Sequence, residues 1–532
     1  MPHHDPSQRQ RRGRGALPLL LLVLALACAP VEAVPAPGPA PDVPQVLRVA
    51  TSVLPPSVTP AASTSAHFIL WTIYDSVTQL GPAFQPQPWG AERWELAPDG
   101  LSWTVTLRSD LRWPDGLTVT AEDVAFSFAQ ARLRRWPASA LLTSVEQVRV
   151  LGSFQVVFTL RHVDLAVPNS LAYLWLIPKH VVEQLGFDEF VRQPMGSGPY
   201  EVAAFQPGVA LVVRKRQPSA GPLHAFRRPI ADEIAFLAMT DPTEKLAALL
   251  EGQVEVAAVQ SFTLAQLDRL QGAGMVVRAL PLATLAFAFP EGTLAARASP
   301  LRDRRVRLAL NYAVNKAALA ARFPGAEPVG QFAFPWSEFW DPAASPLPYD
   351  PERARALLAE AGYPNGLRLE TGIDYQPAII PTDVALAVQR DLAAVGVESE
   401  LVPLASAAYQ DRAFGRGSQP KAELFGAATV DATGFANGIR AVLGCDRPLG
   451  ADLIARWYCN PAWDQLVDQA LRERVPEQRR ALLRAASQLQ RDDLPFLYLI
   501  LQPAYTVHVP SVRIGGLFHL RNFHLDGAYR LR

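Results

Sequence analysis

Residues 98–124 read PDGLSWTVTLRSDLRWPDGLTVTAEDV, and this stretch combines clear strand, turn and helix signals. In 102–108, apolar residues alternate with serine and threonine, which is typical of a strand with one buried face. The following WPDG segment predicts a turn. Thr120 and Asp123 occupy the ends of a capping box, which predicts a helix through Phe128. Strand, turn and helix in close succession indicate an α/β chain.

The same alternation of strands and helices continues along the chain. Asp-Pro pairs open two helices that glycines end, since proline fits the first helical position and glycine the position after the last. The predicted elements are a strand at 154–160, helices beginning at Pro242 and Pro351, a strand beginning near Val254 and a helix near 303–319.

Length and charge exclude several classes of protein. The 532 residues suggest three or four domain-sized units. Fifty basic residues balance fifty acidic ones, which argues against nucleic-acid binding because that needs a basic surplus. A hydrophobic fraction of 49% with only 19% charged residues indicates a folded globular protein.

The amino terminus has the pattern of an export signal. Residues 1–27 combine an arginine-rich start with a twelve-residue apolar run, which is too short to cross a hydrocarbon core about 30 Å thick. The run ends in Ala-Leu-Ala before Cys28, which predicts a lipidated cysteine; ordinary cleavage after Ala27 is the alternative. Residues 28–44 are rich in proline and alanine and predict an extended tether. We therefore expect an exported, periplasmic or cell-surface protein, anchored to the membrane by lipid.

Two further cysteines, Cys445 and Cys459, are expected to pair, because an exported protein meets an oxidising compartment. The alternative is a pair of unpaired, buried thiols. No histidine or third cysteine lies near them, so no metal site is expected. The sequence has no G-x-S-x-G, phosphate-loop or H-E-x-x-H motif, so we expect neither an enzyme nor a cofactor.

Several segments together resemble the family 5 solute-binding proteins of ABC importers, the oligopeptide, dipeptide and nickel group. They occur in family order over about residues 46–500. The matching segments are YDSV at 74–77, PWGAERWE at 88–95, the stretches at 98–108, 113–116 and 120–124, GSGPY at 196–200, RVRLALNYAVNK at 305–316, YDPE at 349–352, LLAEAGY at 357–363, and CNP at 459–461 with Asp464.

The resemblance implies a type II periplasmic-binding-protein fold of two lobes joined by a hinge. It also implies an extra subdomain inserted in the first lobe. The expected boundaries are 45–77, 196–289 and 500–532 for lobe I, 78–195 for the inserted subdomain, and 290–499 for lobe II.

The resemblance further implies capture of a peptide-like or other small solute in an interlobe cleft and delivery to an ABC permease with separate ATPase subunits. We expect a monomer. Two rival functions stay open: an extracellular sensor module of the same fold, and an exported hydrolase.

The family resemblance also bears on the solute. In peptide binders of this family a Trp-x-x-Asp segment holds the peptide amine; here Phe425 takes the tryptophan position and Ala428 the aspartate position, with Asp431 three residues later. Because a desolvated amine needs a counter-charge, an ordinary free-amine peptide is not the expected ligand; a neutral, sugar-like, capped or larger amphipathic solute is the alternative. The candidate ligand residues, for each of which a core or loop role is the alternative, are Ser52, Trp71, Phe287, Phe289, Tyr375, Phe425, Asp431 and Phe435.

Overall fold

The computed structural model describes residues 45–530 with gaps. The gaps are residues 53, 56, 61–66, 82–83, 218–228, 230, 260–261, 292–293, 296–297, 336, 378, 406–407, 410–411, 413–421, 429–439, 441–442, 446–457 and 515–528. The predicted signal peptide (1–27), Cys28 and the tether (28–44) therefore lie outside the described residues, as do Asp431 and Phe435.

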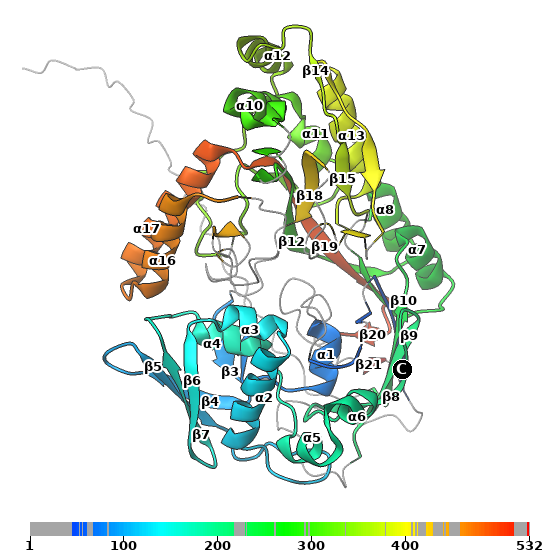
Figure 1. Ribbon diagram of the computed structural model, residues 1–532. Helices are drawn as coiled ribbons and strands as arrows, with labels where there is room; N and C mark the ends of the chain where they lie inside the picture. The colour runs from blue at the N-terminus through cyan, green and yellow to red at the C-terminus, as the bar shows by residue number, and fades with distance from the viewer. Residues whose placement is uncertain are drawn as a thin grey trace, which may run out of the picture. The chain divides into compact units, whose positions relative to one another are not determined.

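One large mixed sheet organises the described part of the chain (Figure 1). Its eleven strands pair in the order β17-β15-β18-β12-β19-β11-β1-β10-β9-β8, with β13 pairing β19 outside this path. The strands are β1 (Val46–Thr51), β8 (Tyr200–Gln206), β9 (Ala210–Lys215), β10 (Glu233–Ala238), β11 (Val256–Val259), β12 (Val276–Ala288), β13 (Glu327–Pro328), β15 (Ile373–Tyr375), β17 (Leu401–Pro403), β18 (Leu424–Ala428) and β19 (Phe496–His508).

Two groups of parallel strands lie toward opposite ends of this sheet. β1 pairs in parallel with β10 and β11, and β15 pairs in parallel with β17 and β18. Parallel neighbours need a crossover connection, usually a helix. Helix α7 (Pro242–Leu250) links β10 to β11, and α13 (Thr382–Ala393) links β15 to β17. Each group therefore has one edge at which several carboxyl ends meet.

The long strands β12 and β19 join the two parallel groups. They pair antiparallel from Val276 opposite His508 to Ala288 opposite Phe496. β11 pairs with the carboxyl-terminal part of β19, and β18 pairs with the carboxyl-terminal part of β12. The β12–β19 register shifts twice: between Pro281 and Ala283, which lies between these two attachments, and between Leu285 and Ala286, where β18 already pairs with β12. The expected boundary at 499/500 falls inside β19, which runs unbroken from Phe496 to His508.

A separate four-stranded antiparallel sheet forms between β1 and β8 in the sequence. Its order is β4-β5-β7-β6, and the strands predicted from 102–108 and 154–160 are confirmed as β5 and β7. Helix α2 (Ala121–Leu133) begins at the predicted capping box, where the Thr120 N–H donates to Asp123 Oδ2 at 2.9 Å. The bounds are β4 (Ala91–Leu96), β5 (Ser102–Leu107), β6 (Val145–Gly152) and β7 (Gln155–Leu160).

The Asp-Pro helices are confirmed, and the prediction near 303–319 is wrong in one respect. The expected single helix is two helices, α10 (Arg304–Ala313) and α11 (Lys316–Ala320). Asn315 interrupts them, because its side chain caps α11 by accepting a hydrogen bond from the Ala318 N–H at 2.9 Å. The strand expected near Val254 begins at Val256.

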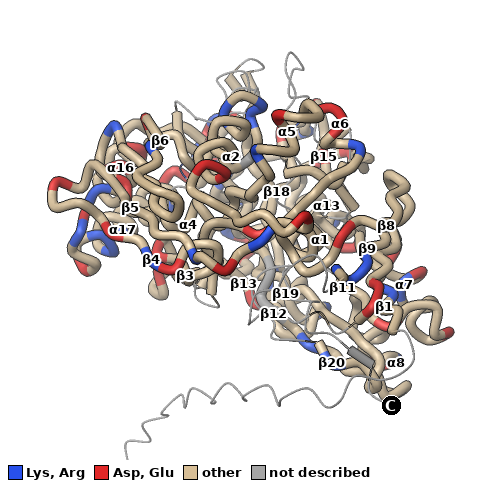
Figure 2. Tube along the Cα trace, turned by 90° about the horizontal axis from the view of Figure 1, so that it is seen from below, with Lys and Arg blue, Asp and Glu red and all other residues tan. Residues whose placement is uncertain are grey.

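The remaining elements complete the described chain, and basic and acidic residues are interspersed along it (Figure 2). They are α1 (His67–Ile73), β2 (Thr78–Leu80), β3 (Pro86–Pro88), α3 (Pro137–Leu141), α4 (Val167–Ser170), η2 (Leu171–Tyr173), α5 (Lys179–Leu185), α6 (Phe187–Arg192), α8 (Leu264–Gly272), η4 (Pro300–Arg302), α12 (Pro351–Glu360), β14 (Leu367–Arg368), β16 (Val397–Glu398), α16 (Pro461–Arg472), α17 (Pro476–Asp493), β20 (Val512–Arg513) and β21 (Tyr529–Arg530).

Candidate functional site

The first candidate surface is the edge where β1, β10 and β11 end. Ser52 follows the last residue of β1 directly and is half-buried. In open α/β sheets, ligands bind outside the carboxyl ends of the parallel strands. This edge, here called the first edge and defined by Ser52, Ala258 and Lys245, is therefore a candidate binding surface.

Lys245 is fully buried beneath the first edge. Its ammonium donates hydrogen bonds to Ser52 Oγ and to the carbonyl oxygen of Ala258, which lies 3.0 Å away on β11. Burial lowers the pKa of Lys245 to about 8, and the neighbouring Glu244 carboxylate opposes part of that shift. Within the described ranges, no carboxylate forms a salt bridge with Lys245. The first edge thus rests on a cation without a bonded counter-charge in this part of the chain.

The second candidate surface is the edge where β15, β17 and β18 end. Asp374, on β15, is nearly fully buried and forms a salt bridge with the guanidinium of Arg412. Tyr409 stacks on Phe425 with ring centroids 4.9 Å apart, and its hydroxyl donates to the carbonyl oxygen of Gly426 at 2.9 Å. Burial raises the pKa of Tyr409, so its hydroxyl stays protonated. This second edge, defined by Asp374, Arg412, Tyr409 and Phe425, contains both partners of its ion pair.

The structure brings three of the predicted ligand residues onto adjacent strands. Phe287 lies on β12, Phe425 lies on β18 one register position away, and Tyr375 ends β15 beside β18. All three are nearly fully buried, so their rings pack in the core around the second edge. As direct ligand contacts they stay a prediction.

The other described candidates lie elsewhere. Ser52 belongs to the first edge. Trp71 lies on α1, where it is buried and meets Trp175 edge-to-face with centroids 6.1 Å apart.

Phe289 follows β12 and lines a pocket of about 420 Å³ together with Arg307. Arg307 donates to the backbone carbonyls of Asp493 and Leu494 at 2.7 and 2.9 Å. Arg307 thus binds the carboxyl end of α17 at one side of the pocket, where the helix dipole stabilises a positive charge.

Sequence reasoning missed Lys245, Tyr409 and the Asp374–Arg412 pair. For Lys245 a signal existed, because it lies on the same helix face as Leu249 and therefore occupies a position where an apolar side chain is expected. For Asp374 and Arg412 no local signal existed, since the two residues are 38 positions apart in the sequence and meet only in the folded chain.

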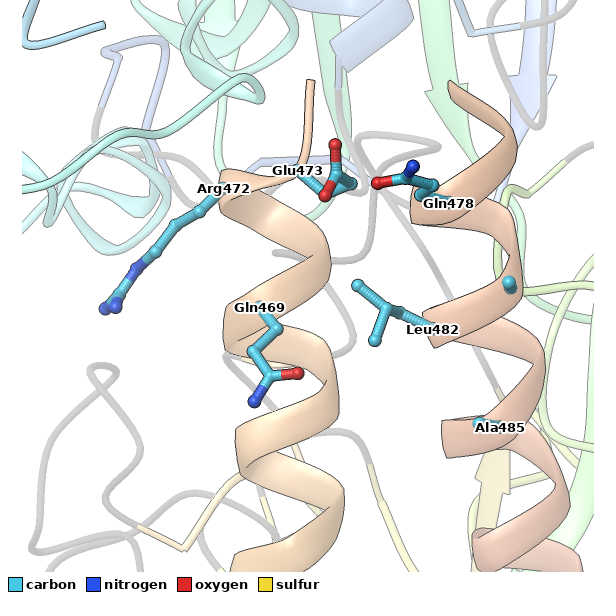
Figure 3. A pocket seen from close by; sticks show the side chains of 7 residues that line it. Gln469, Arg472, Glu473, Gln478, Leu482 and Ala485 are labelled. Atoms are coloured by element: carbon cyan, nitrogen blue, oxygen red, sulfur yellow. The ribbon is translucent and has the colours of Figure 1, made fainter. Parts of the chain in front are cut away.

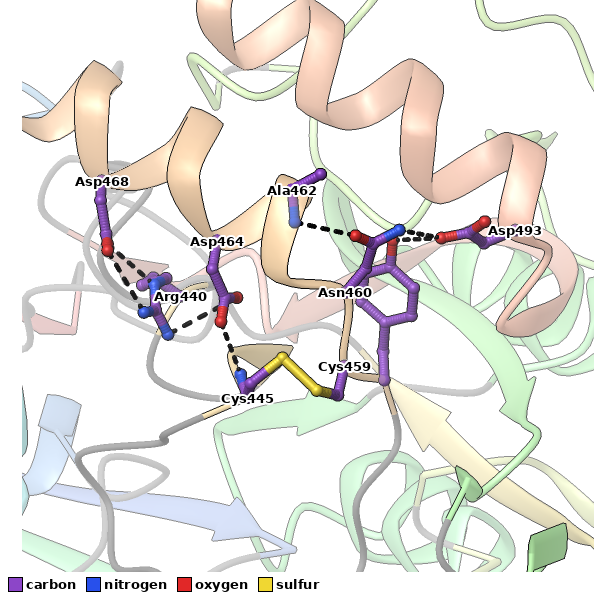
Figure 4. The surroundings of a disulfide bond; sticks show 9 residues. Arg440, Cys445, Cys459, Asn460, Ala462, Asp464, Asp468 and Asp493 are labelled. Carbon is purple, nitrogen blue, oxygen red and sulfur yellow. Dashed lines mark hydrogen bonds and ion pairs between the residues drawn. A yellow bond between two sulfur atoms is a disulfide. The ribbon is translucent and has the colours of Figure 1, made fainter.

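Cys445 and Cys459 form a disulfide in the structure, as Figure 4 shows. The N–H of Cys445 donates to Asp464 Oδ2 at 3.0 Å, and Arg440 forms salt bridges with Asp464 and Asp468. On the other side, Asn460 caps α16 by accepting from the Ala462 N–H at 2.9 Å. The disulfide therefore secures the start of α16.

A groove of about 650 Å³ lies between α16 and α17 (Figure 3). Leu482 points from α17 toward α16, and Gln469 and Glu473 lie on the facing side. The groove is separate from both candidate edges and carries no predicted ligand residue.

The described residues contain neither a metal-binding cluster nor a membrane-spanning helix. No cluster of three or more histidine, cysteine, aspartate or glutamate side chains suited to a metal ion occurs among them. None of the helices formed by these residues has the length and apolarity that a membrane span requires.

Comparisons with known proteins converge on one family. Residues 85–436 match the family model of bacterial extracellular solute-binding proteins, family 5 (middle). The di/tripeptide-binding protein 2 of Pseudomonas aeruginosa is 25% identical over 513 residues, covering 86% of this chain and 89% of that relative.

Solved structures share the fold. The periplasmic binding protein DppA of Helicobacter pylori, in complex with the peptide STSA, aligns with a TM-score of 0.78 at 20% identity, covering 92% of this chain and 98% of that one. The binding protein MoaA of A. tumefaciens R10, in complex with mannopinic acid, aligns with a TM-score of 0.77 at 23% identity, covering 92% and 100%. The expected type II periplasmic-binding-protein fold is thereby confirmed. The chain belongs to family 5 of the bacterial extracellular solute-binding proteins.

Proposed function

We propose that this protein is the extracytoplasmic solute-binding component of an ABC importer. It captures a peptide-like or other small solute between two lobes and delivers it to a membrane permease driven by separate ATPase subunits. The family match supports this function, as do relatives named for di- and tripeptide binding and for glutathione binding.

The observation that carries the proposal is the pair of strands β12 and β19. They connect the parallel group of the first edge to that of the second, and the register shift between Pro281 and Ala283 lies between the two attachments. Proline has no N–H to give to a ladder, and Pro281 opposite Pro503 leaves this stretch with fewer cross-strand hydrogen bonds. We assign the hinge to this stretch, close to the expected lobe boundaries at 289/290 and 499/500.

Contacts outside the hinge support a closed form. The Leu165 N–H donates to the carbonyl oxygen of Leu471 at the end of α16, at 3.3 Å. The Arg474 guanidinium donates to the carbonyl oxygen of Pro98 at 3.0 Å. These bonds join the proposed inserted subdomain, 78–195, to the proposed second lobe. We call them the clasp, and lobe opening would have to break them.

The membrane attachment is part of the same proposal. Residues 1–27 direct export, Cys28 carries the lipid, and residues 28–44 hold the monomeric binding domain away from the membrane surface. Mass spectrometry of protein from a bacterial membrane fraction tests this, because a free amino terminus at Cys28 without added lipid mass would contradict it.

The decisive experiment measures ligand-dependent closure. A ligand shifts an open–closed equilibrium only by its differential affinity for the two states. Solutes that co-purify from a native host are identified by mass spectrometry, removed, and added back during small-angle X-ray scattering. We expect a smaller radius of gyration with the solute. Unchanged scattering with a bound solute, or chemical conversion of that solute, would contradict a transport-binding role.

A further inference from the structure

Lys245 and Ser52 form a polar pair for which the proposed hinge and closure supply no role. The pair lies at the carboxyl edge of the parallel strands, the place where an open α/β sheet binds its ligand. Lys245 is 0% exposed, whereas Ser52 is only half-buried and follows the end of β1. The serine thus stands between a buried cation and the accessible side of the edge.

The chemistry of the two groups determines where the hydroxyl hydrogen of Ser52 can point. A hydroxyl has one hydrogen to donate and two lone pairs to accept with, whereas an ammonium only donates. Lys245 therefore occupies a lone pair of Ser52 Oγ, and the hydroxyl hydrogen of Ser52 must point to a different acceptor. An acceptor on a bound solute would meet that hydrogen at the accessible side of the edge.

The charge of Lys245 selects among possible acceptors. A buried ammonium is costly unless a counter-charge or several hydrogen bonds compensate it. Two of its three N–H groups have acceptors among the described residues, and both acceptors are uncharged. An anionic group against Ser52 would accept the hydroxyl hydrogen and also supply the missing counter-charge.

A second buried lysine provides a comparison. Lys316, on α11, is also nearly fully buried, and burial lowers its pKa to about 8. Its ammonium donates to the backbone carbonyls of Asn311 and, at 3.5 Å, Leu347. Among the residues that the structure describes, Lys316 thus bonds only to backbone, whereas Lys245 bonds to a half-exposed hydroxyl, which it polarises toward a further acceptor.

We propose that Ser52, polarised by Lys245, donates a hydrogen bond to a carboxylate or other oxyanion of the captured solute, an inference that rests on the proposed binding function. The solute class is therefore an organic acid that presents its negative group to the first edge.

The first experiment separates solutes by charge. A small-molecule extract of bacterial culture is divided on an anion exchanger at neutral pH into a retained, anionic fraction and an unretained fraction. Each is added to the full-length, ligand-free protein, and the thermal unfolding midpoint is measured. We expect the anionic fraction to raise the midpoint. A rise produced only by the unretained fraction would overturn the proposal, while no rise with either fraction would count against the binding function itself.

The second experiment assigns the effect to the pair. Hydrogen bonds to charged groups contribute enough that Ser52→Ala and Lys245→Met should each require about tenfold more of the stabilising fraction for half-maximal effect. Ser102→Ala, at a half-buried serine on β5, and Lys316→Met are matched controls, and both should respond as the wild type does. If Ser52→Ala and Lys245→Met also respond at the wild-type dilution, the pair only anchors α7 and the proposal is wrong.

Discussion

The two edges of the large sheet hold their charges in opposite ways. At the second edge, Asp374 is buried and meets the guanidinium of Arg412 within the same half of the protein. At the first edge, Lys245 is buried, and its bonded partners among the described residues are a hydroxyl and a carbonyl oxygen. One edge is electrostatically complete, and the other has a positive charge that its bonded partners do not balance.

This contrast indicates which of the two edges would select the charge of a bound solute. An ion pair that closes on itself offers little field to a ligand, whereas an uncompensated charge near a binding edge acts strongly in a low dielectric. Aromatic residues gather around the second edge, where Phe425 and Tyr409 stack. We infer that the second edge shapes the binding surface and that the first edge supplies its charge preference.

The largest change in the free energy of unfolding is expected when the buried ion pair of the second edge is broken. Arg412→Met removes the cation that faces the buried carboxylate of Asp374, and loss of one partner of a buried ion pair costs about 3–5 kcal/mol. Urea unfolding monitored by tryptophan fluorescence measures the change. The control is Arg353→Met, because both partners of its pair with Glu360 are about half exposed and its loss should cost less than about 1 kcal/mol. Equal losses in both variants would remove the contrast between the edges.

The next effect tests the covalent link in the half that contains the second edge. The cysteines are 14 residues apart in sequence, and closing a loop of that size stabilises a protein by about 3 kcal/mol in the chain-entropy model. Cys445→Ser should therefore lower the free energy of unfolding by about that amount under oxidising conditions. Cys459→Ser should match it, and a reductant should lower the wild type to the same level. Two titratable thiols in the oxidised wild type would contradict the bond.

A pH titration sharpens the description of the first edge. The pKa of Lys245 is about 8 in the folded protein and 10.5 in the unfolded chain, so the unfolded chain binds more protons between these values. The free energy of unfolding should therefore rise with pH through this window, by about 2 kcal/mol per buried lysine between pH 7 and 9.5. Above about pH 10 the buried tyrosines oppose the rise, because burial raises the pKa of Tyr74 and Tyr498 and keeps them neutral.

Lysine variants separate the two contributions to that rise. Lys245→Met and Lys316→Met should each remove part of the slope in denaturant unfolding at pH 7 and 9.5, and the double variant should remove most of it. A slope unchanged in the double variant would show that neither ammonium is desolvated in the folded protein.

Local elements were predictable from the sequence because their signals are local. The Thr120 capping box and the Asp241 and Asp350 caps each place donor and acceptor within three residues of one another, so the motif determines the helix start. The interruption between α10 and α11 at Asn315 is also local, but an asparagine inside an amphipathic pattern can either continue a helix or cap a new one. It becomes a cap because Asp391, from α13, accepts a hydrogen bond from its N–H at 3.0 Å.

The site was less predictable because its geometry depends on distant segments. The pairing of β12 with β19 joins residues more than two hundred positions apart in sequence, and no periodicity reports such a partner. The aromatic candidates Phe287, Tyr375 and Phe425 were recognised as apolar, and the fold then used them mainly as core. Lys245 was overlooked because composition treats lysine as a surface residue, whereas its position in the crossover helix brings it under the strand ends.

The smallest expected effect concerns the clasp that holds the two edges in their present relation. Arg474 is exposed and donates one hydrogen bond, to Pro98 O, so Arg474→Ala should change the free energy of unfolding by less than about 1 kcal/mol. Because that bond exists only while the two proposed lobes are together, its loss acts on the open–closed equilibrium more than on folding. The ligand-free variant should therefore show a larger radius of gyration than the wild type. Arg472→Ala removes the same charge two residues earlier, from an exposed side chain that lines the α16–α17 groove (Figure 3) and is not part of the clasp, and should leave the scattering unchanged. If both variants scatter like the wild type, the clasp does not contribute to closure, and the relation between the two edges depends on the hinge strands alone.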